Sequence, residues 1–207
     1  MSGHGVHAAQ HEAEHRVQHG QGHDTAKEAL NKKIALLISV IALFLALSET
    51  LGKSAQTAGI SFNVEASNLW AFFQAKTIRI TTLRTAADAL RVDAAAATDP
   101  AVRKAMETQN KRWLDTAARY EDEEDPPEGR KQLMARAKEA ERRRDDALAK
   151  YHHYEIASAA YQIGIVLASA AVITGMIVLV YAAIGLAALG LGFTAIGLWA
   201  PHAVHLF

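Results

Sequence analysis

The chain contains no cysteine among its 207 residues and only four prolines. The absence of cysteine excludes disulfides, thiolate metal sites and cysteine nucleophiles, and it leaves the redox compartment undecided. The prolines, at Pro100, Pro126, Pro127 and Pro201, leave long stretches without a helix breaker, and the many alanines favour long helices. The formal net charge is zero, so no overall electric field attracts nucleic acid.

Charged residues are also missing from two parts of the chain. No Asp, Glu, Lys or Arg occurs from Ile156 to Pro201, and a second apolar block runs from Ile34 to Leu47. The stretch between them, Lys53 to Glu155, is strongly charged. A helix needs about 20 apolar residues to cross about 30 Å of hydrocarbon. The composition therefore predicts two parts that lie in lipid and a water-soluble part between them.

The apolar blocks predict three membrane spans. Residues 156–201 are about twice as long as one span requires, so they must fold back and form transmembrane helices 2 and 3. We expect the turn at Thr174-Gly175-Met176, with a turn near Gly185 as the alternative. Residues 32–52 predict transmembrane helix 1, for which an interfacial or packed core helix is the alternative.

The orientation in the membrane follows from the basic residues that flank the spans. Lys27, Lys32 and Lys33 precede the first span and favour a cytoplasmic N-terminus. Residues 142–144 are arginines before the second span and argue the opposite, but long segments translocate largely regardless of their charge. We expect the N-terminus inside, which places the middle segment and the C-terminal tail, 202–207, outside.

The soluble segment, 53–155, has a helical repeat in steps of four and three. Nine of the ten positions on its first stripe are apolar, which is typical of the seam of a coiled coil. The stripe consists of Phe62, Ala66, Leu69, Phe73, Lys76, Ile80, Leu83, Ala87, Leu90 and Ala94. A second stripe consists of Leu133, Ala137, Ala140, Arg144, Ala147, Tyr151, Tyr154 and Ser158. The two stripes predict two helical arms with apolar faces.

Two breaks divide the soluble segment. Thr98 or Asp99 can cap a new helix that begins at Pro100, with an apolar stripe of Val102, Met106, Trp113, Ala117 and Tyr120. An acidic run with two prolines makes a kink at 121–129. We expect an antiparallel hairpin with arms at about 54–97 and 99–155. A three-helix bundle that reverses again at the paired prolines is the alternative.

Three details of the soluble segment have a simple structural interpretation. Lys76 and Arg144 interrupt the stripes, and we expect their stems to pack while their charged ends reach solvent. Trp70 and Phe72 belong to an aromatic cluster that we expect to face a neighbouring helix. The acidic run, 121–128, is expected to be a solvated loop.

The N-terminal tail, 1–26, contains histidines at spacings of three or four residues. On one helix face, pairs of these imidazoles would chelate Zn, Ni or Cu, so the pattern indicates a weakly bound metal. The candidate ligands are His4, His7, His11, His15, His19 and His23. Glycines in the same stretch favour the alternative, a flexible polar tail that binds no cofactor.

Motifs for catalysis are missing. The sequence has no phosphate-binding glycine loop, no HExxH and no nucleophile elbow, and nothing in it resembles a nucleic-acid-binding module.

Alanine-rich seams bury little area, so a single hairpin would be marginally stable and we expect a homo-oligomer. The sequence predicts a non-enzymatic integral membrane protein, a self-associating scaffold or assembly factor. A metal-binding or transport-accessory protein that uses the histidine tail is the alternative.

Several of these features together resemble a family of uncharacterised bacterial membrane proteins, a domain-of-unknown-function family. They are the histidine-rich tail, the short first span, the closing pair of spans and the stretch Asn68-Leu69-Trp70-Ala71-Phe72-Phe73-Gln74-Ala75-Lys76. The resemblance implies a multi-pass protein of the bacterial inner membrane, and it implies no activity, catalytic residue or protein partner. We therefore expect an all-α membrane protein with three spans and a coiled-coil-like hairpin between the first and second, with the lipid bilayer as its first partner.

Overall fold

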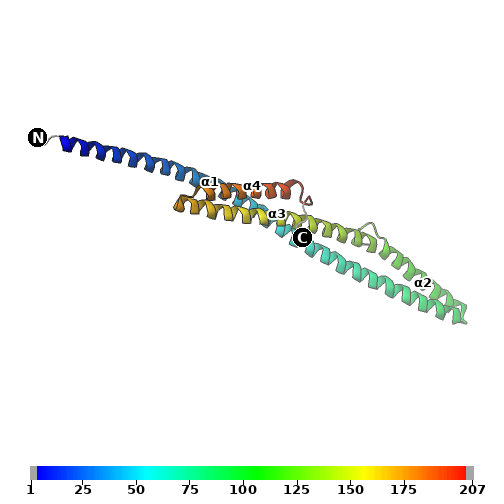
Figure 1. Cartoon of the computed structure of the whole chain (residues 1–207). Helices are drawn as coiled ribbons and strands as arrows, with labels where there is room; N and C mark the ends of the chain where they lie inside the picture. Colours follow the sequence, from blue (N-terminus) through cyan, green and yellow to red (C-terminus); the bar gives the residue numbers. More distant parts are fainter. Residues whose placement is uncertain (1–3, 204–207) are drawn as a thin grey trace. The chain divides into compact units, whose positions relative to one another are not determined.

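The structure is all-helical, as the sequence predicts. The computed structural model describes the backbone of residues 4–203 and the side chains of residues 27–203. Its four helices are α1 (His4–Ala96), α2 (Pro100–Glu121), α3 (Arg130–Thr174) and α4 (Ile177–Trp199) (Figure 1). No strand occurs in the described part of the chain. The helices form two units: Met1–Lys53 with Ala149–Phe207, and Ser54–Leu148, here called the anchor unit and the middle unit.

Helix α2 begins with a cap that the sequence specifies. The Asp99 carboxylate accepts a 2.8 Å hydrogen bond from the amide of Ala101, and Pro100 occupies the first turn. A side-chain oxygen at this position satisfies one of the amides that have no partner in the first turn, and proline lacks the amide that would go unpaired. The chain reversal after α1 therefore lies at the predicted break.

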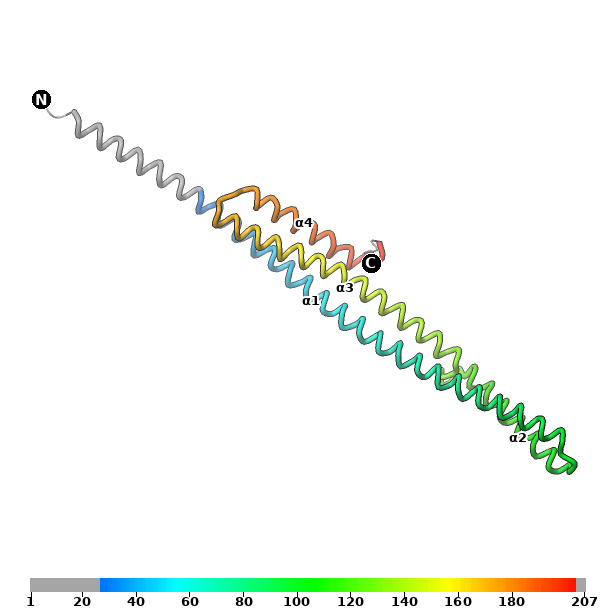
Figure 2. The backbone as a smooth tube through the Cα atoms, turned by 60° about the horizontal axis from the view of Figure 1, so that its bottom comes forward, coloured from blue at the N-terminus to red at the C-terminus, as the bar shows by residue number. Residues whose placement is uncertain are grey.

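The turn between α3 and α4 depends on a glycine. Gly175 has a φ of 71°, a backbone conformation that residues with a Cβ rarely adopt. Its amide donates a 2.8 Å hydrogen bond to the carbonyl of Ala171, which closes the last turn of α3. Helix α4 then runs back along α3 (Figure 2). The turn is at Gly175-Met176, as predicted, and the alternative near Gly185 is wrong because α4 is continuous there.

Alanines pack together with a few large side chains in the interior of the anchor unit. One cluster consists of Ile34 of α1, Ala168 and Ala171 of α3, and Ala183 of α4. A second contains Ile41, Ala157 and Tyr161. Alanine and glycine allow helix backbones to approach closely, and this packing joins all three helices.

The middle unit pairs α1 with α2 and α3 through the predicted stripe. All ten stripe positions of α1 are buried or half-buried. Leu69 and Ala66 form a cluster with Leu133, Ala137 and Ala140 of α3. Nearer the end of α1, the Asn110 side chain of α2 donates to the carbonyl oxygen of Ala87. Helix α2 therefore packs on the C-terminal part of α1, and α3 packs on the part of α1 that comes before it in the chain.

Candidate functional site

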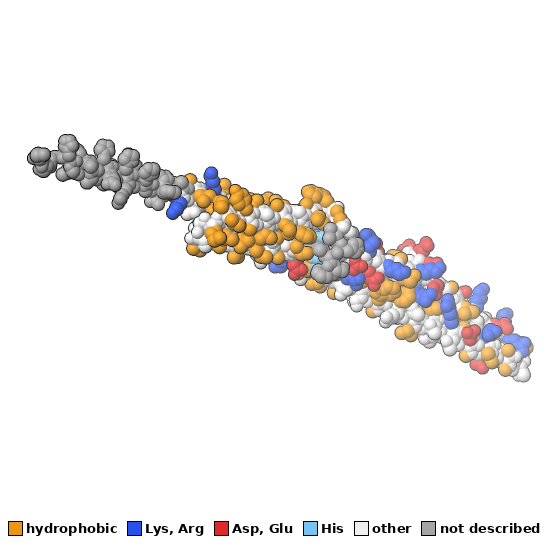
Figure 3. Space-filling model, viewed as in Figure 1, with side chains coloured by type: hydrophobic (Ala, Val, Ile, Leu, Met, Phe, Trp, Pro, Cys, Tyr) orange, Lys and Arg blue, Asp and Glu red, His pale blue; other side chains and the backbone are white. Residues whose placement is uncertain are grey.

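The outer surface of the anchor unit is apolar. Large aliphatic side chains point away from the other helices, and among them Leu36 is 67 % exposed, Val166 65 % and Ile173 86 %. Figure 3 shows hydrophobic side chains gathered over α3 and α4, whereas charged side chains gather on the middle unit. Water-soluble bundles bury their large apolar residues, and large exposed apolar patches mark an interaction surface. This surface is therefore a candidate interaction site.

An aromatic ring packed on a glycine holds α3 against α4. Tyr161 is fully buried, its hydroxyl lies 3.2 Å from Thr194 Oγ1, and its ring stacks on Phe44 of α1. A Cβ at Gly190 would lie 2.6 Å from Cε1 of this ring. The ring occupies the space that any larger residue at position 190 would need, so this contact fixes the distance between the two helices.

Polar groups also lie inside the anchor unit. Ser48 is fully buried and donates a 3.1 Å hydrogen bond to the carbonyl oxygen of Tyr154. His153 is 1 % exposed. Its Nε2 lies 2.9 Å from the carbonyl oxygen of Pro201, and its ring stacks on Phe193. Its Nδ1 has no hydrogen-bond partner among the described residues. The hydrogen bonds of Ser48 and His153 both end on backbone carbonyl oxygens, and they join α3 to α1 and to the segment that follows α4.

Lys76 is buried, and the expectation that its charged end reaches solvent is wrong. The side chain is 5 % exposed, and Nζ lies 3.2 Å from Glu123 Oε2 and 4.5 Å from the ring centre of Tyr120. A buried ammonium is tolerated when a carboxylate and an aromatic face replace its water. A lysine can therefore stand within the apolar stripe, because Glu123 in the loop after α2 supplies a carboxylate for its ammonium group.

The acidic run is accordingly more than a solvated loop. Glu121 accepts two hydrogen bonds from the Arg130 guanidinium, at 2.6 and 3.0 Å, and it also lies 3.5 Å from Arg84. Asp122 accepts hydrogen bonds from Lys131 and from Gln132, and the Lys131 bond is the main reason why the pKa of this carboxyl is lowered. The run connects α2, α3 and α1 by ion pairs.

The aromatic cluster packs in a different register from the expected one. Phe73 joins the cluster of Leu69 and Leu133, whereas Phe72 is 37 % exposed. Trp70 is half-buried, and its indole nitrogen donates a 2.8 Å hydrogen bond to Glu141 on α3. The choice of Phe72 was therefore wrong, and Phe73 is the residue that the four-three repeat itself marks.

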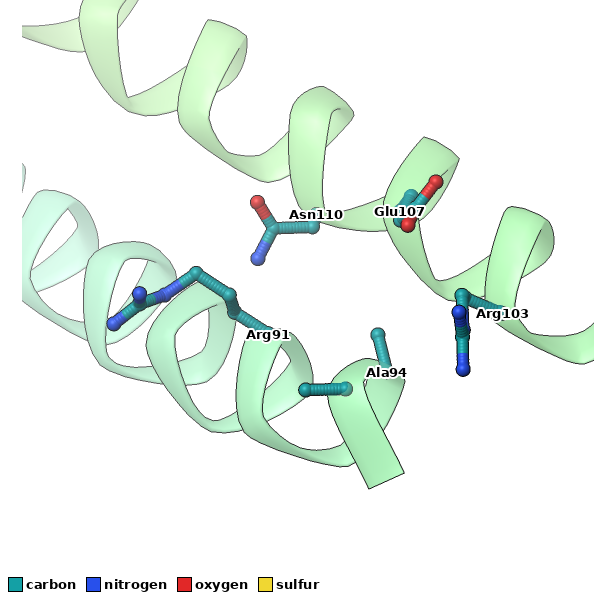
Figure 4. Close-up of a pocket in the computed structure, with 6 residues that line it drawn as sticks. Arg91, Ala94, Arg103, Glu107 and Asn110 are labelled. Carbon is teal, nitrogen blue, oxygen red and sulfur yellow. The ribbon is translucent and has the colours of Figure 1, made fainter. Parts of the chain in front are cut away.

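A pocket of about 490 Å³ lies between α1 and α2 near their junction. Figure 4 shows Arg91 and Ala94 on α1 facing Arg103, Glu107 and Asn110 on α2. Arg103 donates a 2.7 Å hydrogen bond to the carbonyl of Ala97, and Asn110 donates to Ala87. Arg103 and Asn110 are therefore used within the protein, and Arg91 Nη2 lies 3.8 Å from Oδ1 of Asp88 on its own helix, so the pocket is a weak candidate for a ligand site.

The predicted metal ligands lie outside the residues whose side chains the structure describes. They are His4, His7, His11, His15, His19 and His23. Within residues 27–203, no three His, Asp or Glu side chains are grouped closely enough to hold a metal ion. The weakly bound Zn, Ni or Cu stays a prediction.

The helical fold and the exposed apolar surface of the anchor unit define the class of this protein. The protein is an all-helical chain in which three helices, from Lys27–Ala96, Arg130–Thr174 and Ile177–Trp199, are long and apolar enough to cross a membrane. More particularly, it belongs to the DUF4337 family, described as a domain of unknown function, which matches residues 30–200. No curated protein and no solved structure matches this chain. The matched residues span all three candidate membrane helices and the middle unit, and they confirm the resemblance to an uncharacterised family.

Proposed function

We propose that this protein is a non-enzymatic integral membrane protein that serves as a self-associating scaffold or assembly factor. The observation that supports membrane insertion is the inverted packing of the anchor unit. Its interior holds mainly alanine, glycine and hydrogen-bonded polar groups such as Ser48, with a few isoleucines, while many of its large aliphatic side chains, such as Ile173, are exposed. In lipid the outward side chains are solvated, and helices associate through close backbone contact and interhelical hydrogen bonds.

The proposal includes three spans with a long helical hairpin between the first and second. Support comes from the order of contacts in the middle unit, where α2 meets α1 near Ala87 and α3 meets it near Leu69. A second reversal at Pro126-Pro127 would bring α3 back toward the far end of α1 instead. The contacts favour two arms over the three-helix bundle.

A scaffold role is supported by how little the middle unit buries. Six residues of the two stripes that are buried there are alanines, which bury little area per residue, so a single hairpin gains little stability from its own seam. Contact between copies would add the missing buried area. The family resemblance adds the bacterial inner membrane, and Lys27, Lys32 and Lys33 support a cytoplasmic N-terminus.

Membrane fractionation tests the proposal. Membranes that contain the full chain are washed with alkaline carbonate and then sedimented at high speed. We expect the protein in the pellet, with release only by detergent, and we expect a mass above one copy when it is extracted into lipid nanodiscs. Protein that stays in the supernatant without detergent would overturn the membrane assignment, and a single-copy mass would overturn the scaffold role.

A further inference from the structure

A strip along the exposed face of α1 in the middle unit carries no charge, although five exposed charged residues lie directly beside it: Glu65, Arg79, Arg84, Arg91 and Asp93. Five residues spaced seven apart lie along the strip and are all exposed. We call them the outer stripe: Val64, Ala71, Ile78, Thr85 and Val92. The positions three and four residues before and after each of them, from 60 to 96, hold a single charged residue, Asp88. The outer stripe lies opposite the stripe that packs on α2 and α3, so it is free for a second contact.

Comparison with α3 shows that this lack of charge is unusual for a face in water. Residues 130–148 of α3 include 11 charged residues among 19, and their exposed face is covered with ion pairs such as Arg142 with Glu139. Residues 54–96 of α1 include only seven among 43. Val64, Ile78 and Val92 are 54 %, 67 % and 65 % exposed. A solvated helix keeps polar and charged groups on its outer face, so the uncharged outer stripe of α1 fits a partner better than the outer face of α3 does.

Two hydroxyl groups beside the outer stripe are already hydrogen-bonded within the protein. Thr82 Oγ1 donates a 2.9 Å hydrogen bond to the carbonyl of Ile78, and Thr81 Oγ1 donates one of the same length to the carbonyl of Thr77. A hydroxyl that is already bonded to its own helix can be buried without leaving an unpaired donor. These two hydroxyls can therefore be covered at little desolvation cost.

We propose that the outer stripe is the surface through which two copies of this chain pair, with their α1 helices parallel and in register. The inference rests on the proposed self-association and names the surface that produces it. Because residues 54–96 follow the first span directly in every copy, two copies in one bilayer present α1 in the same chain direction. Parallel pairing places each residue beside its own counterpart, so any charge on the stripe would repel itself, and the stripe has none.

The length of the outer stripe is sufficient for a stable contact. Residues 60–96 rise about 55 Å at 1.5 Å each, and a helix presents a face about 10 Å wide. Each copy would cover about 550 Å², or about 1,100 Å² in total, which exceeds the roughly 1,000 Å² of a specific interface. The repeat of seven residues is the one with which two helices stay in contact along a left-handed supercoil.

The lack of native cysteine makes the pairing testable in the full chain within membranes. Single variants Val64→Cys, Ile78→Cys and Val92→Cys are oxidised and analysed for covalent dimers, with Arg136→Cys on the exposed face of α3 as the matched control. Two cysteines form a disulfide only when their Cα atoms lie about 4.4–6.8 Å apart. We expect dimers from all three stripe variants and none from the control.

An antiparallel contact would cross-link Ile78→Cys alone among the single variants, and would join Val64→Cys to Val92→Cys in a mixture, which would overturn the parallel arrangement. The charge variant Ile78→Glu should weaken association in nanodiscs about tenfold or more, while Arg136→Glu should not. An oligomer of unchanged mass in Ile78→Glu, without stripe cross-links, would overturn this surface and leave self-association standing. A single-copy mass for the unaltered protein would overturn both.

Discussion

The contact between Tyr161 and Gly190 provides a sharp test of how the anchor unit is packed. A Cβ added at Gly190 would lie 2.6, 2.8 and 2.9 Å from three atoms of the Tyr161 ring, closer than real side-chain atoms approach. The ring cannot move away cheaply, because it is fully buried, stacks on Phe44 and is tied to Thr194 through its hydroxyl. The variant Gly190→Ala must therefore separate α3 from α4 or displace the ring.

The expected cost follows from two opposing terms. Forcing an extra methyl group into a packed interior costs about 1–3 kcal/mol. Alanine is a better helix former than glycine by about 1 kcal/mol, which offsets part of this cost. Gly185→Ala is the matched control, since it has the same propensity gain on the same helix and nothing lies within 4 Å of its added Cβ. The free energies of unfolding of the two variants should therefore differ by about 1–3 kcal/mol.

Unfolding of the full chain in mixed detergent micelles, followed by far-UV circular dichroism, measures this difference. We expect Gly185→Ala to be at least as stable as the unaltered protein and Gly190→Ala to be less stable. In a Tyr161→Ala background the penalty of Gly190→Ala should disappear, because the atoms that collide with the new methyl group are gone. Equal stability of Gly190→Ala and Gly185→Ala would refute the packing of α4 on α3 described above.

Three further predictions concern the middle unit and the tail. Glu123→Gln should destabilise the middle unit by about 1–3 kcal/mol, since it leaves the buried Lys76 ammonium without a carboxylate. Lys76→Met should destabilise it less, because it removes the buried charge as well. Hydrogen exchange of the amides around position 76 measures the stability of both variants. Hydrogen bonds from Arg142 and Arg143 lower the pKa of Glu139 from 4.5 to about 2, so this carboxylate stabilises the fold above pH 4.5. That contribution to stability is lost as the pH falls through about 2. An NMR titration of labelled Glu139 should show a midpoint near pH 2. A midpoint near 4.5 would contradict the hydrogen bonds to both arginines. Calorimetry with Zn, Ni and Cu should show binding to the intact protein that disappears when residues 1–25 are deleted, and equal heats for both forms would exclude a metal role for the tail.

The sequence is most informative where the backbone itself constrains the chain. Asp99-Pro100 predicts the start of α2 because a side-chain cap and a proline both suit the first turn. Gly175 predicts the turn between α3 and α4 because only glycine adopts its φ easily. Every position that the four-three repeat marks on the stripe of α1 is buried or half-buried, since a seam needs apolar residues at that spacing.

Interactions between residues far apart in the chain could not be predicted in the same way. The burial of Lys76 depends on Glu123, 47 positions away, and no local pattern joins the two. The same holds for Tyr161 and Thr194 in the anchor unit. The repeat did contain one unused signal, because it marks Phe73 and not Phe72 as the inward ring.

The inverted packing of the anchor unit affects how its stability responds to temperature. Unfolding in water exposes apolar surface and raises the heat capacity, which makes stability pass through a maximum and fall on cooling. Helices that separate inside a bilayer move their aliphatic side chains from one hydrocarbon surrounding to another. In the proposed membrane-inserted state, exposed residues such as Leu36 and Ile173 would touch lipid before and after separation, so the heat-capacity change should be small. The three helices should then hold together almost equally well in the cold and at moderate warmth.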